Sequence, residues 1–491
     1  MDRTRLRLAR GQSAAAASLG LWLAVLGHAA PALGASCETL RPTDALGADG
    51  ISYGDAEVLS FAWPEGRARV FYATSGSHAP SLRAVDGDTP DVVRVAATAA
   101  EEALARYMEL GFDEPPSDAA SSCPSNGGDG RTDVYLVDLA STADGKAVAD
   151  DCELLGGVRR CSGFVLVDND FRQGGYASVA EGLRTVVPHE LFHLVQNGYA
   201  AGTDRWWLEG TAQWAAKRVY PELTDLERHL PSFFRQTWRS IDVPPAGVVA
   251  SYLYATAIWP QFLSERHGDA LVRRIFEAER AEPQSALAAA EQVLAQDGSS
   301  LADEFLLFAA YNAATGSRAA QGSGYAAAAA YPLVEVEPFS ASPGTSVTGV
   351  LAGFGVFYYE VMAGPARVLE LEAEASRVQA LFLPSEASKV RVDRAQALPT
   401  TTTESGILVV SGQSAAKTDA AFVVKASAVD SAKTAANASC NSSRHGHRAS
   451  SSRGASAWIS ALSLLLALRA VGRRRSARAL ASRTAPTPED P

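Results

Sequence analysis

The spacing of apolar and polar positions divides the chain into two regions with different patterns, and the change falls near residue 331. Before that point, alternating runs typical of strands occupy residues 67–76, 132–139 and 162–170. Helical patterns lie between and after these runs, including an Ala-rich and Leu-rich part over about 247–316. This mixture predicts an α+β domain spanning residues 35–330.

Beyond residue 330, short alternating runs are separated by Gly, Pro and Ser. The clearest are TSVTGVL, FGVFYYEVM, ARVLELEA, VQALFLP, GILVVSG and AAFVVKA. Runs of this kind are typical of an all-β sandwich, so we expect a β-sandwich domain over residues 331–427. Residues 428–453 are rich in Ala, Ser and Asn and favour a flexible linker.

The two ends of the chain have the composition of export and membrane segments. Residues 1–34 place arginines first, then an apolar run, then small residues, which is the order of a secretory signal peptide. An uncleaved anchor is the alternative. Residues 454–491 combine a short apolar stretch with an Arg cluster, which predicts a short transmembrane helix with its arginines in the cytoplasm. We therefore expect an exported protein, anchored at the cell surface or outer membrane or secreted.

Composition narrows the range of partners. The chain has 491 residues, 47% of them apolar, enough for two or three domains. Its net charge is −11 and both ends are basic, so the body is more acidic still, which argues against nucleic acid as a partner. No two cysteines have the C-x-x-C spacing of a zinc knuckle. In an oxidising compartment four of the five could form two disulfides, most simply Cys152–Cys161; the other two are Cys37 and Cys123.

Candidate chemistry is concentrated in the stretch VVPHELFHLVQNGY, residues 186–199. Positions i and i+4 lie on one face of a helix, so His189 and His193 point the same way. Imidazole nitrogens are preferred zinc ligands, and Glu190 can take the proton of a bound water and pass it to a leaving amine. Pro188 either starts or kinks this helix, which we expect to end near Asn197-Gly198.

A third ligand is needed. The continuation His-x-x-Gly-x-x-His is absent, because Gln196 and Tyr199 occupy those positions. Sixteen residues after His193, Glu209 lies in WWLEGTAQW on a second predicted helix that starts near Asp204. A reversal at Asn197-Gly198 would bring the two helices together, and His, His and Glu are the ligands of one large class of zinc hydrolases. The alternative is a solvated acid, although flanking tryptophans indicate a buried setting where a lone carboxylate is costly.

HELFH with a downstream W-x-x-E-G-x-A-x-W resembles the gluzincin-type zinc metallopeptidases, and more narrowly those of myxobacterial and related secreted proteins, over roughly residues 65–280. The resemblance implies a zincin-like domain that binds one zinc ion through His189, His193 and Glu209, with Glu190 as general base and a protein or peptide as substrate. Gln213 stands where some gluzincins place an Asp that supports a ligand histidine.

Further candidates carry competing structural interpretations. Tyr252 or Tyr254 could stabilise the oxyanion, although each could be a core tyrosine. His229 and His267 are further candidates, with surface histidines as the alternative. The strand GFVLVDN could offer its edge to an extended peptide or be a plain core strand. Calcium, a hard cation that prefers oxygen ligands, is conceivable but unsupported at acids that loop capping explains equally well: Asp86, Asp88 and Asp91, or Asp168 and Asp170.

In the tail, Cys440, a linker, an apolar stretch and an Arg cluster together resemble the MYXO-CTERM sorting signal. In that family the cysteine precedes a membrane segment that is removed as the protein is transferred to the cell surface, which implies that Cys440 is a sorting or lipidation site. A simple C-terminal anchor is the alternative.

These observations predict a surface-anchored zinc metalloendopeptidase that hydrolyses peptide bonds by a zinc-bound water. The rival hypothesis is a catalytically inactive or adhesive surface protein that binds a partner through the β-sandwich. A zinc hydrolase acting on a non-peptide amide is a third. The sequence does not predict the cleavage preference or the oligomeric state.

Overall fold

The structure is a computed structural model that describes residues 40–119, 125–140, 142–172, 174–247, 250–413 and 419–429. It is a mixed α+β structure with several sheets. None of the helices in the described ranges has the length and apolar character of a membrane span. The expected signal peptide, most of the linker and the expected sorting segment lie outside these residues, as do Cys37, Cys123 and Cys440.

The N-terminal sheet has the strand order β1-β2-β3-β5-β4. Strands β2, β3 and β5 run parallel, whereas β1 and β4 pair antiparallel at the two edges. Of the two interpretations of the strand at 162–170, the free edge is therefore wrong and the core strand is confirmed, because β5 pairs with β3 on one side and β4 on the other. The strands are β1 (Val58–Phe61), β2 (Ala68–Ala73), β3 (Thr132–Val137), β4 (Gly145–Leu155) and β5 (Val158–Asp168).

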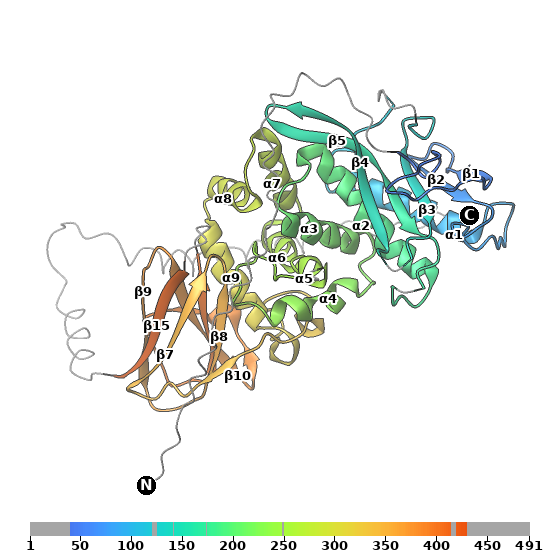
Figure 1. Ribbon diagram of the computed structural model, residues 1–491. Coiled ribbons are helices and arrows are strands. Elements are labelled where there is room, and N and C mark those ends of the chain that lie inside the picture. Colours follow the sequence, from blue (N-terminus) through green and yellow to red (C-terminus); the bar gives the residue numbers. More distant parts are fainter. Residues whose placement is uncertain are drawn as a thin grey trace, which may run out of the picture.

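The two faces of this sheet are covered differently. Helices α1 (Asp91–Glu109) and α2 (Val179–Ala200) contribute to the main core together with the sheet (Figure 1). On the opposite face, the N-terminal segment inserts Tyr53 among residues such as Tyr135 and Phe164. An irregular segment that carries Tyr53, rather than a helix, therefore covers that face of the sheet.

Helix α2 differs from its expected bounds at both ends. It begins at Val179, where the Ser178 hydroxyl accepts a hydrogen bond from the Glu181 N–H and caps the helix, so Pro188 lies inside it. It continues to Ala200, past the expected stop at Asn197-Gly198. A Cβ added at Gly198 would lie 3.0 Å from Pro116 Cδ, so this glycine allows close packing rather than ending the helix.

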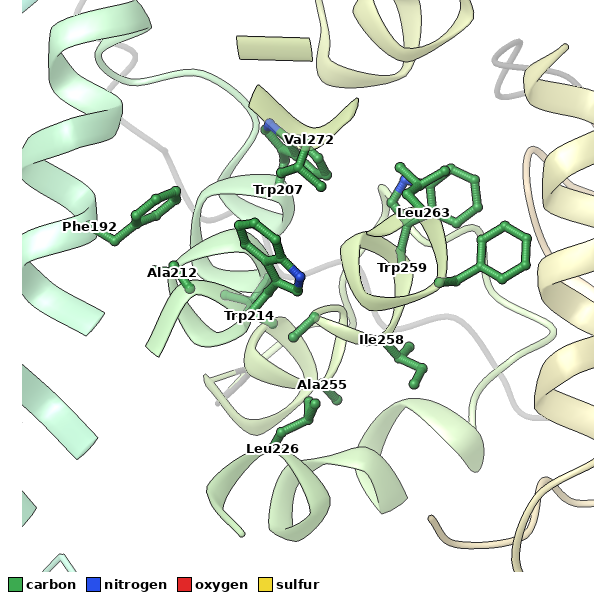
Figure 2. Packing of buried hydrophobic residues seen from close by; sticks show 14 of the residues in the cluster. Phe192, Trp207, Ala212, Trp214, Leu226, Ala255, Ile258, Trp259, Leu263 and Val272 are labelled. Atoms are coloured by element: carbon green, nitrogen blue, oxygen red, sulfur yellow. The ribbon is translucent and has the colours of Figure 1, made fainter. Parts of the chain in front are cut away.

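Helix α3 carries WWLEGTAQW and packs its large side chains into the main core. Trp207 and Trp214 are fully buried among helices α2, α6 and α7 (Figure 2). A Cβ added at Gly210 would lie 2.5 Å from Thr256 Oγ1, so this glycine lets α3 pack closely against Thr256. The helices after α2 are α3 (Arg205–Val219), α4 (Asp225–Phe234), α5 (Ala250–Ala255), α6 (Ile258–His267), α7 (Ala270–Ala281), α8 (Ala286–Gln296) and α9 (Leu301–Ala313), with 3-10 turns η1 (Gly316–Arg318) and η2 (Ala328–Ala330).

The C-terminal part contains two further sheets, and each of the six runs expected to be strands is one. Their orders are β11-β10-β14-β8-β6, with β12 also paired to β10, and β13-β9-β15-β7. Buried side chains from both sheets, such as Tyr359 and Phe422, share one core. The elements are β6 (Glu337–Phe339), β7 (Thr345–Ala352), β8 (Val356–Val361), β9 (Arg367–Ala373), β10 (Val378–Glu386), β11 (Lys389–Val390), η3 (Val392–Arg394), β12 (Gln396–Ala397), β13 (Thr400–Thr402), β14 (Gly406–Gly412) and β15 (Asp419–Ala428).

Candidate metal centre

Helices α2 and α3 bring His189, His193 and Glu209 together. The Nε2 atoms of the two histidines lie 3.2 Å apart. Glu209 Oε2 lies 3.3 Å from His189 Nε2 and 3.5 Å from His193 Nε2. The candidate ligand atoms all lie within 4.8 Å of one another, and this is the group of His, Cys, Asp or Glu in the described part of the chain that could hold one ion.

The three side chains, called the trio below, change one another's pKa values because they are in contact. Burial alone would lower the pKa of His193, but the hydrogen bond to Glu209 and the charges of Glu209 and Glu190 outweigh burial and raise that pKa to about 9. Burial would likewise raise the pKa of Glu209, yet the hydrogen bonds from both histidines lower it well below its usual range. The Glu209 carboxylate is thus held in its charged form beside the two imidazoles.

The donor set fits a divalent metal ion. Two imidazole nitrogens and one carboxylate oxygen are the ligands that catalytic zinc sites use, with water or substrate as the fourth ligand. The side chains of His193 and Glu209 are each 18% exposed, whereas His189 is 7% exposed. The cluster therefore sits at the edge of the core, where one side is open to solvent.

Glu190 lies beneath the edge strand β4. The backbone of Ala147 on β4 faces the Glu190 carboxyl and acts to lower its pKa. A Cβ added at Gly145 would lie 2.8 Å from Glu190 Cγ and 3.1 Å from its Oε1, so only glycine lets the strand approach this closely. Burial raises the pKa of Glu190, against the opposing effect of the two histidines.

Of the two tyrosine candidates, only Tyr254 lies at the trio. Its ring centroid is 5.2 Å from that of His189 and 5.0 Å from that of His229. Burial and the charges of Glu209 and Glu190 raise the pKa of Tyr254, so it keeps its hydroxyl proton at neutral pH. Tyr252 instead packs against Phe233 in the core, with its ring centroid 5.7 Å away.

The two further histidine candidates are not surface residues. The His229 side chain is 12% exposed, and its Nε2 lies 3.5 Å from Asp225 Oδ2. Asp225 also accepts a hydrogen bond from Gln213 Nε2 at 2.8 Å, so Gln213 supports Asp225 rather than a ligand histidine. The His267 side chain is 4% exposed and lies 3.2 Å from Glu304, outside the trio.

The acids considered for calcium make local contacts in loops. Asp168 accepts hydrogen bonds from the backbone of Leu139 and Phe171, and Asp170 pairs with Arg172. Asp91 accepts one from the Val85 N–H, while Asp86 and Asp88 are exposed. Calcium thus has no support at these acids.

The expected Cys152–Cys161 disulfide is present and joins opposite residues of β4 and β5. The bond links the two strands of the β4–β5 hairpin. Strand β4 of this hairpin is also the strand that contacts Glu190.

Comparison with known proteins leaves the activity open. A family of unknown function, DUF6055, matches residues 177–329, the part that contains the trio. No curated protein matches the chain. One similar solved structure is PliG from Salmonella Typhimurium, a periplasmic lysozyme inhibitor of g-type lysozyme, with 9% identity over 19% of this chain and 97% of that one. Its TM-score of 0.14 is too low to carry an argument.

Proposed function

We propose that the protein is an exported, surface-anchored zinc metalloendopeptidase with a zincin-like catalytic domain and an accessory β-sandwich. The observation that carries the proposal is the convergence of His189, His193 and Glu209 within 4.8 Å, with Glu190 adjacent. A zinc ion at this site would polarise a carbonyl and make a water nucleophilic at neutral pH.

The chain's own residues supply the proton transfers and charge stabilisation. Glu190, packed against Gly145 of β4, takes the proton of the attacking water and gives it to the leaving amine. Tyr254 donates its hydroxyl proton in a hydrogen bond to the oxyanion that develops on the substrate. His229, in ring contact with Tyr254 and held by Asp225, is positioned to share that role.

The full-length protein tests the proposal. We expect about one zinc per chain by elemental analysis and cleavage of a denatured protein substrate. Glu190→Gln should reduce cleavage roughly 100- to 10,000-fold, the usual contribution of a general base, and leave the zinc content unchanged. Glu181→Gln, at the start of the same helix, should change neither quantity.

Two outcomes would count against an endopeptidase. A chain without zinc would remove the basis of the proposal. Zinc without cleavage of any denatured protein would favour the adhesive alternative, in which the metal has a structural role and the β-sandwich binds a partner.

A further inference from the structure

We infer that Gln196 is a positioning residue for the metal centre. It fixes the tautomer of His193 and ties that ligand to the turn of α3 that carries Glu209. The inference deepens the proposed function and rests on it, because it concerns how the same site is prepared for its ion.

Gln196 lies one turn beyond His193 on α2 and is 2% exposed. Its Oε1 is 2.7 Å from His193 Nδ1. Its Nε2 is 2.8 Å from the carbonyl oxygen of Leu208 and 2.9 Å from Thr211 Oγ1, both on α3. One buried amide therefore bridges the two helices that carry the ligands.

The chemistry of these partners fixes the direction of every hydrogen bond. The Leu208 carbonyl can only accept, so the amide group of Gln196 must direct its NH₂ toward α3. The Thr211 hydroxyl donates to the Trp207 carbonyl at 2.6 Å and is thus free to accept from the same NH₂. The Oε1 of Gln196 consequently faces His193.

An amide oxygen can only accept, so the proton of a neutral His193 must reside on Nδ1. The lone pair is then on Nε2, the atom that faces His189 and Glu209. Without this bond, the neutral imidazole could also place its proton on Nε2, where it would block metal binding. Hydrogen bonds from the second nitrogen of a ligand histidine commonly set its tautomer and orientation in metal sites.

The bridge also sets the position of the third ligand. Leu208 directly precedes Glu209, and Thr211 follows it by two residues, so both anchor points of Gln196 on α3 flank the ligand. The network leaves neither hydrogen of the amide, nor its oxygen, without a partner. A fully paired buried amide rigidifies its surroundings, whereas a partly paired one is costly.

The test measures zinc affinity of the full-length protein by competition with a chromophoric chelator. Gln196→Met, which keeps the length but removes the hydrogen bonds, should weaken zinc binding 10- to 100-fold. Gln196→Glu retains an acceptor for His193 Nδ1–H and should recover part of that loss. The matched control is Gln261→Met, a buried glutamine of α6 that bonds to Glu265, which should leave the affinity within about twofold of wild type.

A second measurement follows the tautomer without metal. In zinc-free protein with ¹⁵N-labelled histidine, at a pH high enough to make the His193 ring neutral, that ring should give the Nδ1–H signature in wild type and a mixture in Gln196→Met. Unchanged zinc affinity together with an unchanged tautomer in Gln196→Met would overturn the inference, as would an equal loss of affinity in Gln261→Met. If wild type bound no zinc, the proposed function would fail, while the tautomer signature would still decide the effect of Gln196 on His193.

Discussion

Two buried groups of side chains in this protein compensate the negative charge of their carboxylates in different ways. In the first, the Arg41 guanidinium, fully buried, lies 2.5 Å from Asp133, 2.6 Å from Asp118 and 2.8 Å from Asp150. In the second, the trio of His189, His193 and Glu209, the Glu209 carboxylate lies 3.3 Å from the imidazole of His189 and 3.5 Å from that of His193. The Arg205 side chain, which is 70% exposed, lies 3.7 Å from the other oxygen of Glu209.

The difference shows why clustered acids alone do not indicate a metal site. The Arg41 group contains more carboxylates, but a cation of the chain itself already bonds to each of them. The trio instead presents the lone-pair atoms of three different side chains to one point, and two of those atoms are imidazole nitrogens that transition metals prefer. The type of the ligand atoms and their convergence on one point therefore distinguish a metal site from an ion-pair cluster better than the number of nearby charges does.

The two groups also differ in the direction in which acid pKa values move. Burial raises the pKa of Asp133 to about 7, although the Arg41 charge opposes this. The pKa of Glu209 is lowered, because hydrogen bonds from the histidines exceed the effect of burial. One guanidinium is thus shared among three buried carboxylates. The stability of the fold should therefore depend strongly on this arginine.

The largest expected effect is on the Arg41 group. Arg41→Met leaves three buried carboxylates without their cation, and we expect the free energy of unfolding to fall by about 3–5 kcal/mol in chemical denaturation. Arg67→Met, which breaks an exposed pair with Glu114, should cost under about 1 kcal/mol. Equal effects of the two substitutions would show that the buried group contributes no more than a surface ion pair.

The next effect concerns the trio and depends on metal. Zinc at roughly 100 times its Kd should stabilise the wild type by about 2.7 kcal/mol relative to chelator-treated protein. Glu209→Gln should lose most of this gain, while Arg67→Met should retain it. The measurement is the unfolding midpoint of each protein with and without zinc, and an undiminished zinc effect in Glu209→Gln would remove that residue from the ligand set.

How much could be predicted from sequence differs between the two groups for a physical reason. Helical spacing fixes the relation of His189 to His193, and a short connection limits where Glu209 can lie, so local geometry suffices. Arg41 gives no such signal, because Asp118 and Asp150 are 77 and 109 residues away in sequence. Their proximity is a product of the whole sheet and its covering segment.

The edge strand was missed for a related reason. GKAVADDCELL, the sequence of β4, places two acids and a cysteine in its middle and lacks a clean apolar alternation. Its strand character comes from antiparallel pairing with β5, including the disulfide. The contacts of Gly145 and Ala147 with Glu190 follow from that pairing, so they could not be read from the residues next to the histidines.

A buried acid outside both groups, Glu279, has neither a cation nor an imidazole facing it among the described residues. Glu279 on α7 is 1% exposed, and neither of its carboxylate oxygens has a hydrogen-bond partner of good geometry among the described residues. Burial, and then the charge of Asp204, raise its pKa to about 8, while the Trp207 indole opposes the rise. The folded protein therefore holds a proton that the unfolded chain releases above about pH 4.5.

This difference fixes the sign of the pH dependence. Stability from this group is complete below the unfolded pKa and falls as pH rises toward 8, because the unfolded state then binds fewer protons. Glu279→Gln should remove this loss and raise the free energy of unfolding by about 2 kcal/mol at pH 8, with little gain at pH 5; the buried amide, itself poorly paired, limits the gain. Denaturation curves at the two pH values measure it. A gain of the same size at both would mean that burial does not raise the pKa of Glu279 in the folded protein.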